Sequence, residues 1–427
     1  MIDAQTIPAP APRFKRLAGV ASRYGMSAFG PVSISAAHFI ASLIFLHAFA
    51  PALFGLFSFA LVIVPLCLSM SAALLGAPVA TAITRGHALS DHELASLMKA
   101  NFVFATVAGV VIAILLFTSG ANATLAGLLG LYGGAMTLRW FARSYAYTQR
   151  AIARVAASDF CYSVLLTASL TALLATHTLT PANAAVAMSV SIALALLPFG
   201  EEFLQKQIVS LFTGSLGFYG AIWRDLTRWS LLGVVATELT ANAHAYIVTF
   251  VSGPKAFALL AAGSLFMRPV SLCLSALPDL ERPAMARKIA AGQANRAYTH
   301  VREFRAAASV IWICTIVLSL VVMRWFPSLI VKHGYAATDI ATVVALWSAI
   351  MAVRLLRTPE SVLLQAAREF RPLAGASLWS SVISLALTLA LLLMFGPIAS
   401  LCGILVGDLV MTARILILAR QWRAQHG

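Results

Sequence analysis

Two charged side chains interrupt neighbouring apolar stretches of this 427-residue sequence. Glu238 lies 15 residues before Gly253, which marks the turn between the two stretches, and Arg268 lies 15 residues after it. If both stretches are helices, each charge lies about 22 Å from the turn, so the two can meet. A charge at that depth of a membrane is costly and usually faces a cavity or a partner. We therefore expect Glu238 and Arg268 to line a cavity, with an ion pair between them as a further hypothesis.

Small polar residues recur at helical spacing around these charges and in two earlier apolar stretches. Residues three, four, seven or eleven positions apart share one face of a helix, so each group forms a stripe. The stripes comprise Glu238 and Asn242; Ser264, Arg268, Ser271 and Ser275; Ser35, His38 and Ser42; and Ser58, Pro65 and Ser69. Such stripes either line a polar cavity or let membrane helices pack closely. His244 points away from the Glu238 face, and we expect it to be a packing residue.

Asp408 is a third charged residue inside an apolar stretch, and two roles are possible for it. It either caps a polar cluster or pairs with an Arg of a neighbouring helix. We include it with the candidate binding residues, which are Arg268, Glu238, Asn242, Ser264, Ser271, Ser35, His38 and Asp408.

Catalytic and metal-binding patterns are absent from the sequence. The five cysteines are scattered without a Cys-x-x-Cys pair, so neither a metal site nor a disulfide framework is indicated. No Gly-x-x-x-x-Gly-Lys-Ser/Thr loop is present to hold nucleotide phosphates. We expect no catalytic residues, no metal and no cofactor, and we expect that the protein is not an enzyme.

These residues sit within twelve apolar segments that we predict to be transmembrane helices. The sequence is 60% hydrophobic and 11% charged, and an apolar helix of about 20 residues spans the hydrocarbon core of a bilayer. The fold class is therefore an all-α polytopic membrane protein. The predicted segments are 30–49, 56–83, 99–118, 121–141, 159–177, 182–199, 229–252, 256–281, 306–326, 338–356, 373–395 and 397–419.

The basic residues predict the orientation of the chain. Of the 30 Lys and Arg residues, almost all fall in the two tails and in every second gap between segments. Lys255, Arg324 and Lys332 occupy the other gaps, and Arg268 lies inside a segment. By the positive-inside rule both termini are cytoplasmic. Because topology explains the net charge of +15, no nucleic-acid partner is expected.

The segments divide into two sets of six. We predict a cytoplasmic tail over 1–28, a first bundle over 29–199, a linker over 200–228, and a second bundle with a basic tail over 229–427. The linker is expected to form an amphipathic helix at the cytoplasmic membrane surface. Its expected apolar stripe consists of Leu204, Ile208, Leu211 and Phe212.

An internal repeat relates the two sets. The run that begins at Phe54 contains Pro65 in the sequence PLCLS, and the run that begins at Phe257 contains Pro269 in the sequence PVSLCLS. The repeats lie six segments apart, so the halves should be parallel and related by an axis along the membrane normal. A proline inside a helix kinks it, so we expect hinges at Pro65 and Pro269.

Two stretches resemble bacterial polysaccharide flippases of the MOP (multidrug/oligosaccharidyl-lipid/polysaccharide) exporter superfamily. The first runs from Gly30 through HFIASLIFLHAFAPALFGLFSFALVIVPL and includes a turn of the type Pro-x-x-Phe-Gly at residues 51–55. The second is ALLAAGSLFMRPVSLCLSALPDLERPAMARKIAAGQ, which is similar to their eighth helix and the following cytoplasmic loop.

The resemblance implies two six-helix bundles around a central cavity, lined by the first, second, seventh and eighth helices. It implies a location in a bacterial inner membrane and export of a polyprenyl-diphosphate-linked oligosaccharide to the periplasmic leaflet, for exopolysaccharide, capsule or O-antigen assembly. The implied partners are this lipid-linked oligosaccharide, membrane lipids, a polysaccharide polymerase and a coupling ion. Arg268 matches a tendency of the family to place cations in the cavity, and its guanidinium can bind a diphosphate through two parallel hydrogen bonds.

Other functions and one subfamily are less well supported. A multidrug or metabolite antiporter of the same superfamily would favour acidic residues in its cavity. A membrane-embedded glycan polymerase would need larger outer loops than this sequence offers. Ser35 and His38 stand where some lipid-precursor flippases carry an inner Arg, and the two extra C-terminal helices of peptidoglycan-precursor flippases have no counterpart here.

Overall fold

The computed structural model describes residues 13–76, 79, 90–149, 151–326 and 335–426, and every regular element in these ranges is a helix. Among the described residues nine helices are long and apolar enough to cross a membrane, or ten if the helix pair Pro254–Leu265 and Arg268–Ala290, bent by 68°, counts as one span. Two further long helices coincide with the fourth and seventh predicted segments but carry more polar residues. The predicted all-α membrane fold is confirmed, and each predicted segment coincides with a helix or a bent helix pair in the described ranges.

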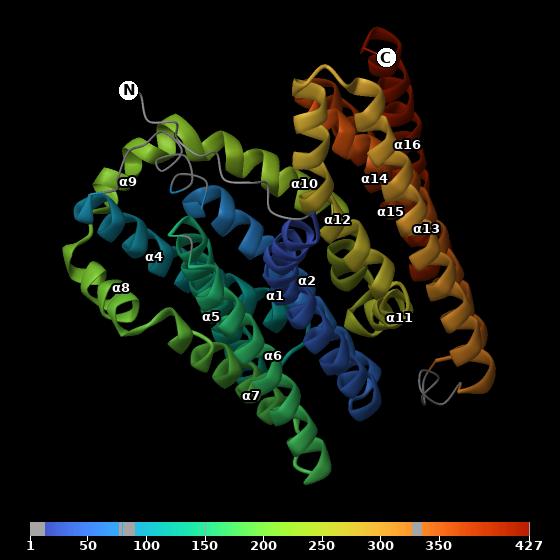
Figure 1. The fold of residues 1–427 in the computed structure, drawn as a ribbon. Helices are drawn as coiled ribbons and strands as arrows, with labels where there is room; N and C mark the ends of the chain where they lie inside the picture. The colour runs from blue at the N-terminus through green and yellow to red at the C-terminus, as the bar shows by residue number, and fades with distance from the viewer. Residues whose placement is uncertain (1–12, 77–78, 80–89, 150, 327–334, 427) are drawn as a thin grey trace, which may run out of the picture.

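The first half of the chain forms the blue-to-green group of helices in Figure 1. A π-helical turn over Ala72–Gly76 extends the second helix, and a 3-10 turn over Leu197–Phe199 follows the last one. The helices are α1 (Arg13–Ala48), α2 (Pro51–Ser71), α4 (Asp91–Thr118), α5 (Ala123–Thr148), α6 (Ile152–Ala175) and α7 (Pro181–Leu194).

The second half forms the yellow-to-red group, and its helices pack in the same pairs as those of the first half. The pairs α1/α6, α4/α5, α5/α7 and α6/α7 correspond to α10/α15, α13/α14, α14/α16 and α15/α16. This correspondence agrees with the parallel repeat predicted from the sequence. The helices are α10 (Arg228–Ser252), α11 (Pro254–Leu265), α12 (Arg268–Ala290), α13 (Ala294–Trp325), α14 (Ala337–Ala366), α15 (Phe370–Phe395) and α16 (Pro397–His426).

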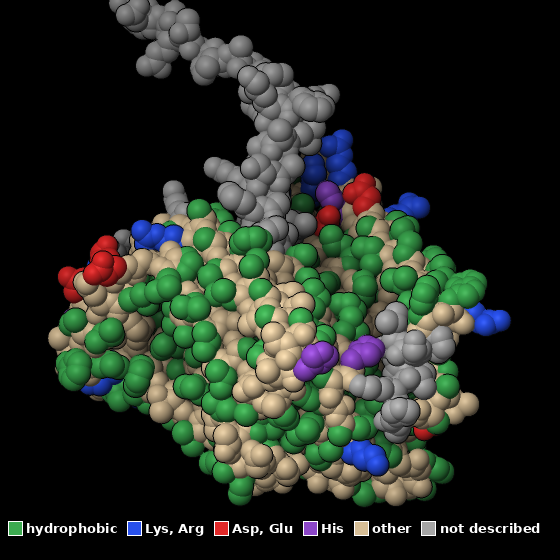
Figure 2. All heavy atoms as spheres, turned by 90° about the horizontal axis from the view of Figure 1, so that it is seen from below, with side chains coloured by type: hydrophobic (Ala, Val, Ile, Leu, Met, Phe, Trp, Pro, Cys, Tyr) green, Lys and Arg blue, Asp and Glu red, His purple; other side chains and the backbone are tan. Residues whose placement is uncertain are grey.

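Glycine and proline make two of the tight turns at the end of the molecule opposite the C-terminus. Gly253 ends α10 with φ of 82°, and Gly396 ends α15 with φ of 86°, a region that non-glycine residues rarely adopt. Pro254 and Pro397 then begin the next helix, where the missing N–H of proline costs nothing. This end of the molecule, seen in Figure 2, shows few charged side chains.

The linker contains the predicted amphipathic helix, but a different face of it is buried. The linker elements are α8 (Glu201–Thr213), α9 (Leu216–Ile222) and a π-helical turn over Trp223–Thr227. Phe203, Gln207 and Ser210 of α8 pack against α4, where the Gln207 amide donates to the Met98 carbonyl. Phe212 is 84% exposed. The buried face of α8 is turned toward α4, so Ile208 and Phe212 of the predicted apolar stripe point outward. Outward apolar side chains are compatible with a helix at the membrane surface, and this location stays a prediction.

Close helix contacts and outward apolar residues complete the membrane architecture. A Cβ on Gly130 of α5 would lie 2.5 Å from the Gly109 carbonyl oxygen of α4, and a Cβ on Gly403 of α16 would lie 2.4 Å from the Thr388 nitrogen of α15. Glycine is therefore required where these helix backbones touch. Large apolar side chains such as Ile114 (55% exposed) face outward, as expected of a surface that is surrounded by lipid tails.

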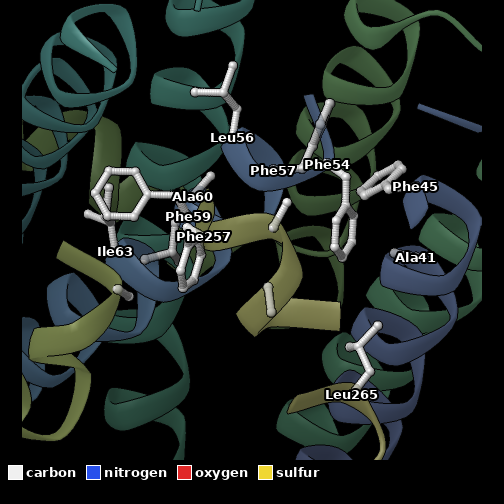
Figure 3. Packing of buried hydrophobic residues seen from close by; sticks show 14 of the residues in the cluster. Ala41, Phe45, Phe54, Leu56, Phe57, Phe59, Ala60, Ile63, Phe257 and Leu265 are labelled. Atoms are coloured by element: carbon white, nitrogen blue, oxygen red, sulfur yellow. The ribbon is translucent and has the colours of Figure 1, made fainter. Parts of the chain in front are cut away.

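The main hydrophobic cluster joins the two halves at the end opposite the C-terminus. Figure 3 shows Phe59 and Ile63 of α2 beside Phe257 of α11, with Phe45 of α1 nearby. The Phe59 ring lies 6.2 Å from that of Phe257, centroid to centroid, and 5.7 Å from that of Phe250 on α10. These contacts close the molecule between the halves at this end.

A candidate substrate cavity between the two halves

A polar cavity of about 230 Å3 lies beneath the closed end, between the two halves. It is lined by α1, α2, α10, α11 and the start of α12, which are the helices expected from the resemblance, and also by α14, which was not expected. Its polar lining residues are Ser42, Ser58, Asn242, His244, Ser264, Arg268, Ser271, Trp347 and Arg354. Arg268, Asn242, Ser264 and Ser271 are therefore brought together in the cavity.

A sharp bend places Arg268 in this cavity. The predicted eighth helix is divided into α11 and α12, with Phe266 and Met267 between them, and the two parts meet at 68°. Pro269, predicted to be a hinge, is the second residue of α12 and directly follows the break. Pro65 also borders the cavity, but α2 continues through it without a break. A sharp bend is thus present beside Pro269, and hinge motion at either proline stays a prediction.

Arg268 has no anionic partner among the residues that the structure describes. Its Nε–H group is buried and donates no hydrogen bond to the protein. A guanidinium that is buried without a counter-charge is costly, because it loses hydration that nothing in the protein replaces. The Arg268 side chain is therefore suited to bind an anion that enters the cavity.

The hypothesised ion pair between Glu238 and Arg268 is not formed among the described side chains. Instead the Ser69 hydroxyl of α2 donates to the Glu238 carboxylate at 2.7 Å, and the Asn242 amide lies 3.4 Å from the other carboxylate oxygen. The physical reason is the bend before Arg268, which turns α12 away, while α10 packs against α2 and α11. Glu238 does not border the cavity itself.

Asp408 takes the second of its two predicted roles, which is pairing with arginines of a neighbouring helix. The Arg354 Nε atom of α14 donates to its carboxylate at 2.7 Å, and Arg357 donates to the other oxygen. Asp408 is 7% exposed and does not border the cavity, whereas Arg354 does. The cluster contains two positive charges and one negative charge, so its net charge is +1. Because Arg354 borders the cavity, the cluster makes this wall of the cavity cationic.

The first half contains a similar cluster on the corresponding helix. Arg139 and Arg143 of α5 both bond to the buried Asp159 of α6, Arg143 at 2.8 Å. The two arginine pairs thus lie on corresponding helices, α5 and α14, whereas the carboxylate comes from α6 in the first half and from α16, which corresponds to α7, in the second. An Arg partner for Asp408 was one of two predicted alternatives, but the Asp159 cluster and the second arginine at Asp408 were not predicted, because these arginines were treated as loop charges that set the topology. Their spacing of about one helical turn, beside an apolar segment with one Asp, was the available signal.

Ser35 and His38 are placed away from the cavity, inside the first half. The His38 Nε2 atom lies 2.8 Å from the Tyr162 hydroxyl, which in turn lies 3.0 Å from the Tyr132 hydroxyl. Neither Ser35 nor His38 borders the cavity, whereas Ser42, one turn beyond His38, does. The stripe on α1 therefore reaches the cavity only at Ser42, while His38 is bonded to Tyr162 of α6.

His244, expected to be a packing residue on a different face from Glu238, borders the cavity, whereas Glu238 does not. Its ring lies 5.3 Å from that of Trp347 on α14, in an edge-on arrangement, and both side chains border the cavity. With Arg268 and Arg354, these residues give the cavity two cations and two aromatic rings. No Asp or Glu is found in its lining among the described residues, and no group of three or more His, Cys, Asp or Glu comes together in them to hold a metal ion.

No family model matches this sequence, and no curated protein matches it. The fold, however, matches solved structures of transporters. An inward-facing multidrug resistance transporter of the MATE family of the MOP superfamily gives a TM-score of 0.67 at 12% identity, over 92% of this chain and 95% of the other. The lipid II flippase MurJ, in an inward closed conformation, gives a TM-score of 0.68 at 10% identity, over 92% and 87% of the two chains.

An outward-facing multidrug resistance transporter of the MATE family gives a TM-score of 0.58 at 13% identity, over 94% of each chain. The chain therefore has the fold of MOP-superfamily transporters, which confirms the fold that the resemblance implied.

Proposed function

We propose that this protein is a flippase that moves a polyprenyl-diphosphate-linked oligosaccharide across the membrane by alternating access. The direction proposed is from the cytoplasmic leaflet, on the side of the termini, to the periplasmic leaflet. The fold of a MOP-superfamily transporter and the resemblance of the two sequence stretches support this class of substrate. The chemistry of the cavity and of its surroundings supports it further.

The cavity suits the diphosphate of such a substrate. Arg268 is unpaired there, and Arg354 keeps part of the excess positive charge of its cluster with Asp408. A guanidinium binds phosphate oxygens through two parallel hydrogen bonds, and these bonds are strong because both partners are charged. The serine hydroxyls and the Asn242 amide in the same wall can bind sugar hydroxyls.

An apolar pocket that adjoins the cavity is the observation that carries the proposal. This pocket of about 190 Å3 lies between α1 and the bend of α11 and α12, and Phe39, Leu43, Phe266 and Pro269 are among its lining residues. Leu265 borders both the cavity and the apolar pocket. A polar site with an apolar site directly beside it fits a molecule that has an anionic head and a hydrocarbon chain.

A multidrug or metabolite antiporter is the alternative function, because the fold is shared with MATE transporters. The cationic cavity wall favours the flippase, since a cationic drug would be repelled by Arg268 and Arg354. A glycan polymerase is not supported by any arrangement of the described residues that could act as nucleophile and base.

The proposal is tested with the purified protein in liposomes. A fluorescent polyprenyl-diphosphate oligosaccharide is placed in both leaflets, and an impermeant quencher reports how fast it crosses, with and without imposed proton or sodium gradients. We expect crossing at least about tenfold faster than in protein-free liposomes, which is a change of about 1.4 kcal/mol in the barrier. Transport of ethidium without transport of the lipid-linked sugar would contradict the flippase and favour the antiporter.

A further inference from the structure

A second charged pocket, of about 280 Å3, lies apart from the central cavity, between α13, α14 and α16. These helices stand side by side at the right of Figure 1. The pocket is lined by Tyr298 and Arg305 of α13, Glu360 of α14, and Arg420 and Arg423 of α16. The proposed transport function uses none of these residues.

The depth of this pocket corresponds to the headgroup region of one leaflet. Glu360 and Arg420 each lie 23 residues after the first residue of their helix, at the end opposite the C-terminus. At 1.5 Å per residue this distance is about 35 Å, slightly more than the hydrocarbon thickness of about 30 Å. The charged side chains therefore reach the polar surface of the leaflet on the side of the termini.

The charges in the pocket are unbalanced and partly unpaired. Arg305 donates to one oxygen of the Glu360 carboxylate, a side chain that is only 3% exposed, while the other oxygen, Oε2, is buried without a hydrogen-bond partner. The Arg305 Nε atom is also buried without a partner. Three guanidinium groups face one carboxylate, so the pocket has a net charge of about +2. It can therefore accept an anion.

One of the arginines is held in place by an aromatic ring. The Arg423 guanidinium carbon lies 4.2 Å from the centre of the Tyr298 ring, and this stacking leaves its N–H groups in the plane of the guanidinium free to donate. Arg420 lies one turn away along α16 and is exposed. The two arginines therefore present their donors at one side of the pocket.

An apolar track leads from the pocket toward the middle of the membrane. Leu356 lies one turn from Glu360 on α14 and is 46% exposed, and Leu409 lies three turns from Arg420 on the same face of α16 and is 48% exposed. Because α14 and α16 pack together, these leucines can contact a hydrocarbon chain whose polar end is in the pocket.

We propose that this pocket binds the headgroup of an anionic phospholipid of the phosphatidylglycerol type. The phosphodiester is bound by Arg420 and Arg423, and an acyl chain lies along Leu356 and Leu409. Basic pockets between membrane helices at the surface are suited to such lipids. This binding is independent of the transported substrate.

The test is native mass spectrometry of the full-length protein, titrated with phosphatidylglycerol or with phosphatidylcholine of the same acyl chains. We expect phosphatidylglycerol to bind more tightly, and the double variant Arg420→Gln/Arg423→Gln to weaken it roughly 25-fold, or about fivefold per arginine. Arg414→Gln is the matched control, since Arg414 is exposed on the same helix outside the pocket. It should leave the affinity unchanged.

A second arm distinguishes a lipid from a free phosphate. Inorganic phosphate and glycerol phosphate, at concentrations a hundred times that of the lipid, should fail to displace phosphatidylglycerol. Displacement by either would overturn the lipid assignment, because the apolar track would then contribute nothing. Equal affinity for the two phospholipids, or unchanged binding in the double variant, would overturn the site itself.

Discussion

The Ser69 hydroxyl of α2 donates a hydrogen bond of 2.7 Å to the Glu238 carboxylate of α10, and this bond joins the two halves. Hydrogen bonds to charged groups contribute about 1.5–3 kcal/mol. Ser69→Ala should therefore let the halves separate on the side of the termini, with a population shift of about tenfold or more.

Paired spin labels on Gln205 of α8 and Arg287 of α12, both exposed, should report this separation as a longer distance. Ser275→Ala is the control, because the Ser275 hydroxyl bonds only to the Leu272 carbonyl of its own helix. Identical distance distributions in the Ser69→Ala variant and the parent would show that the bond does not hold the halves together.

Gly55 of α2 touches the backbone of α11 at the closed end. A Cβ at this position would lie 1.9 Å from the Pro254 carbonyl oxygen, so Gly55→Ala must push α2 and α11 apart. We expect a longer distance between spin labels on Ala52 and Lys255, together with a shift toward outward-facing conformations. Gly127→Ala is the control, since a Cβ there meets nothing within 4 Å. An unchanged distance would show that this contact does not close the outer end.

The Asp408 carboxylate neutralises one of the two arginines that it binds. Asp408→Asn should leave the partly buried Arg354 and Arg357 without a counter-charge and lower the free energy of unfolding by about 3 kcal/mol, the lower end of the range for a buried pair. Thermal unfolding of the protein in nanodiscs measures this change. Glu202→Gln removes a carboxylate of α8 that is exposed and paired only with Lys206, and should have no measurable effect. Equal stability of both variants would refute the structural role of the Asp408 cluster.

The orientation in the membrane is still a prediction from the basic residues. Ala337→Cys, at the start of α14, should react with an impermeant thiol reagent added outside cells, and Ala291→Cys, at the other end of α13, should not. Ala291 is preferred to its neighbour Gly292, whose φ of 68° would be strained by a side chain. The reverse labelling pattern would invert the orientation and the proposed direction of transport.

The sequence predicts the helices well because length and hydropathy are local properties. It also places Arg268, Asn242, Ser264 and Ser271 on one cavity, since helical spacing fixes which residues share a face. It does not predict that Glu238 bonds to Ser69, because this depends on how α10 packs against α2.

The charged clusters could not be identified from spacing alone. An Arg near the end of an apolar segment, such as Arg354, has the same pattern whether it lies in a loop or binds Asp408 inside the bundle. Only the packing of α14 against α16 brings the two together. The same holds for Arg139 and Asp159, where α5 must first lie beside α6.

The central claim, that Arg268 binds the diphosphate of the transported lipid, is tested most directly by equilibrium binding. Polyprenyl diphosphate should bind the purified protein more tightly than polyprenyl monophosphate. Arg268→Lys should weaken binding of the diphosphate, because it loses the planar fork, and Arg268→Ala should weaken it about tenfold or more. Arg324→Ala, an exposed arginine at the end of α13, should not. Unchanged affinity in Arg268→Ala, with the protein folded, would contradict the account and leave recognition to the hydroxyl and amide groups of the cavity.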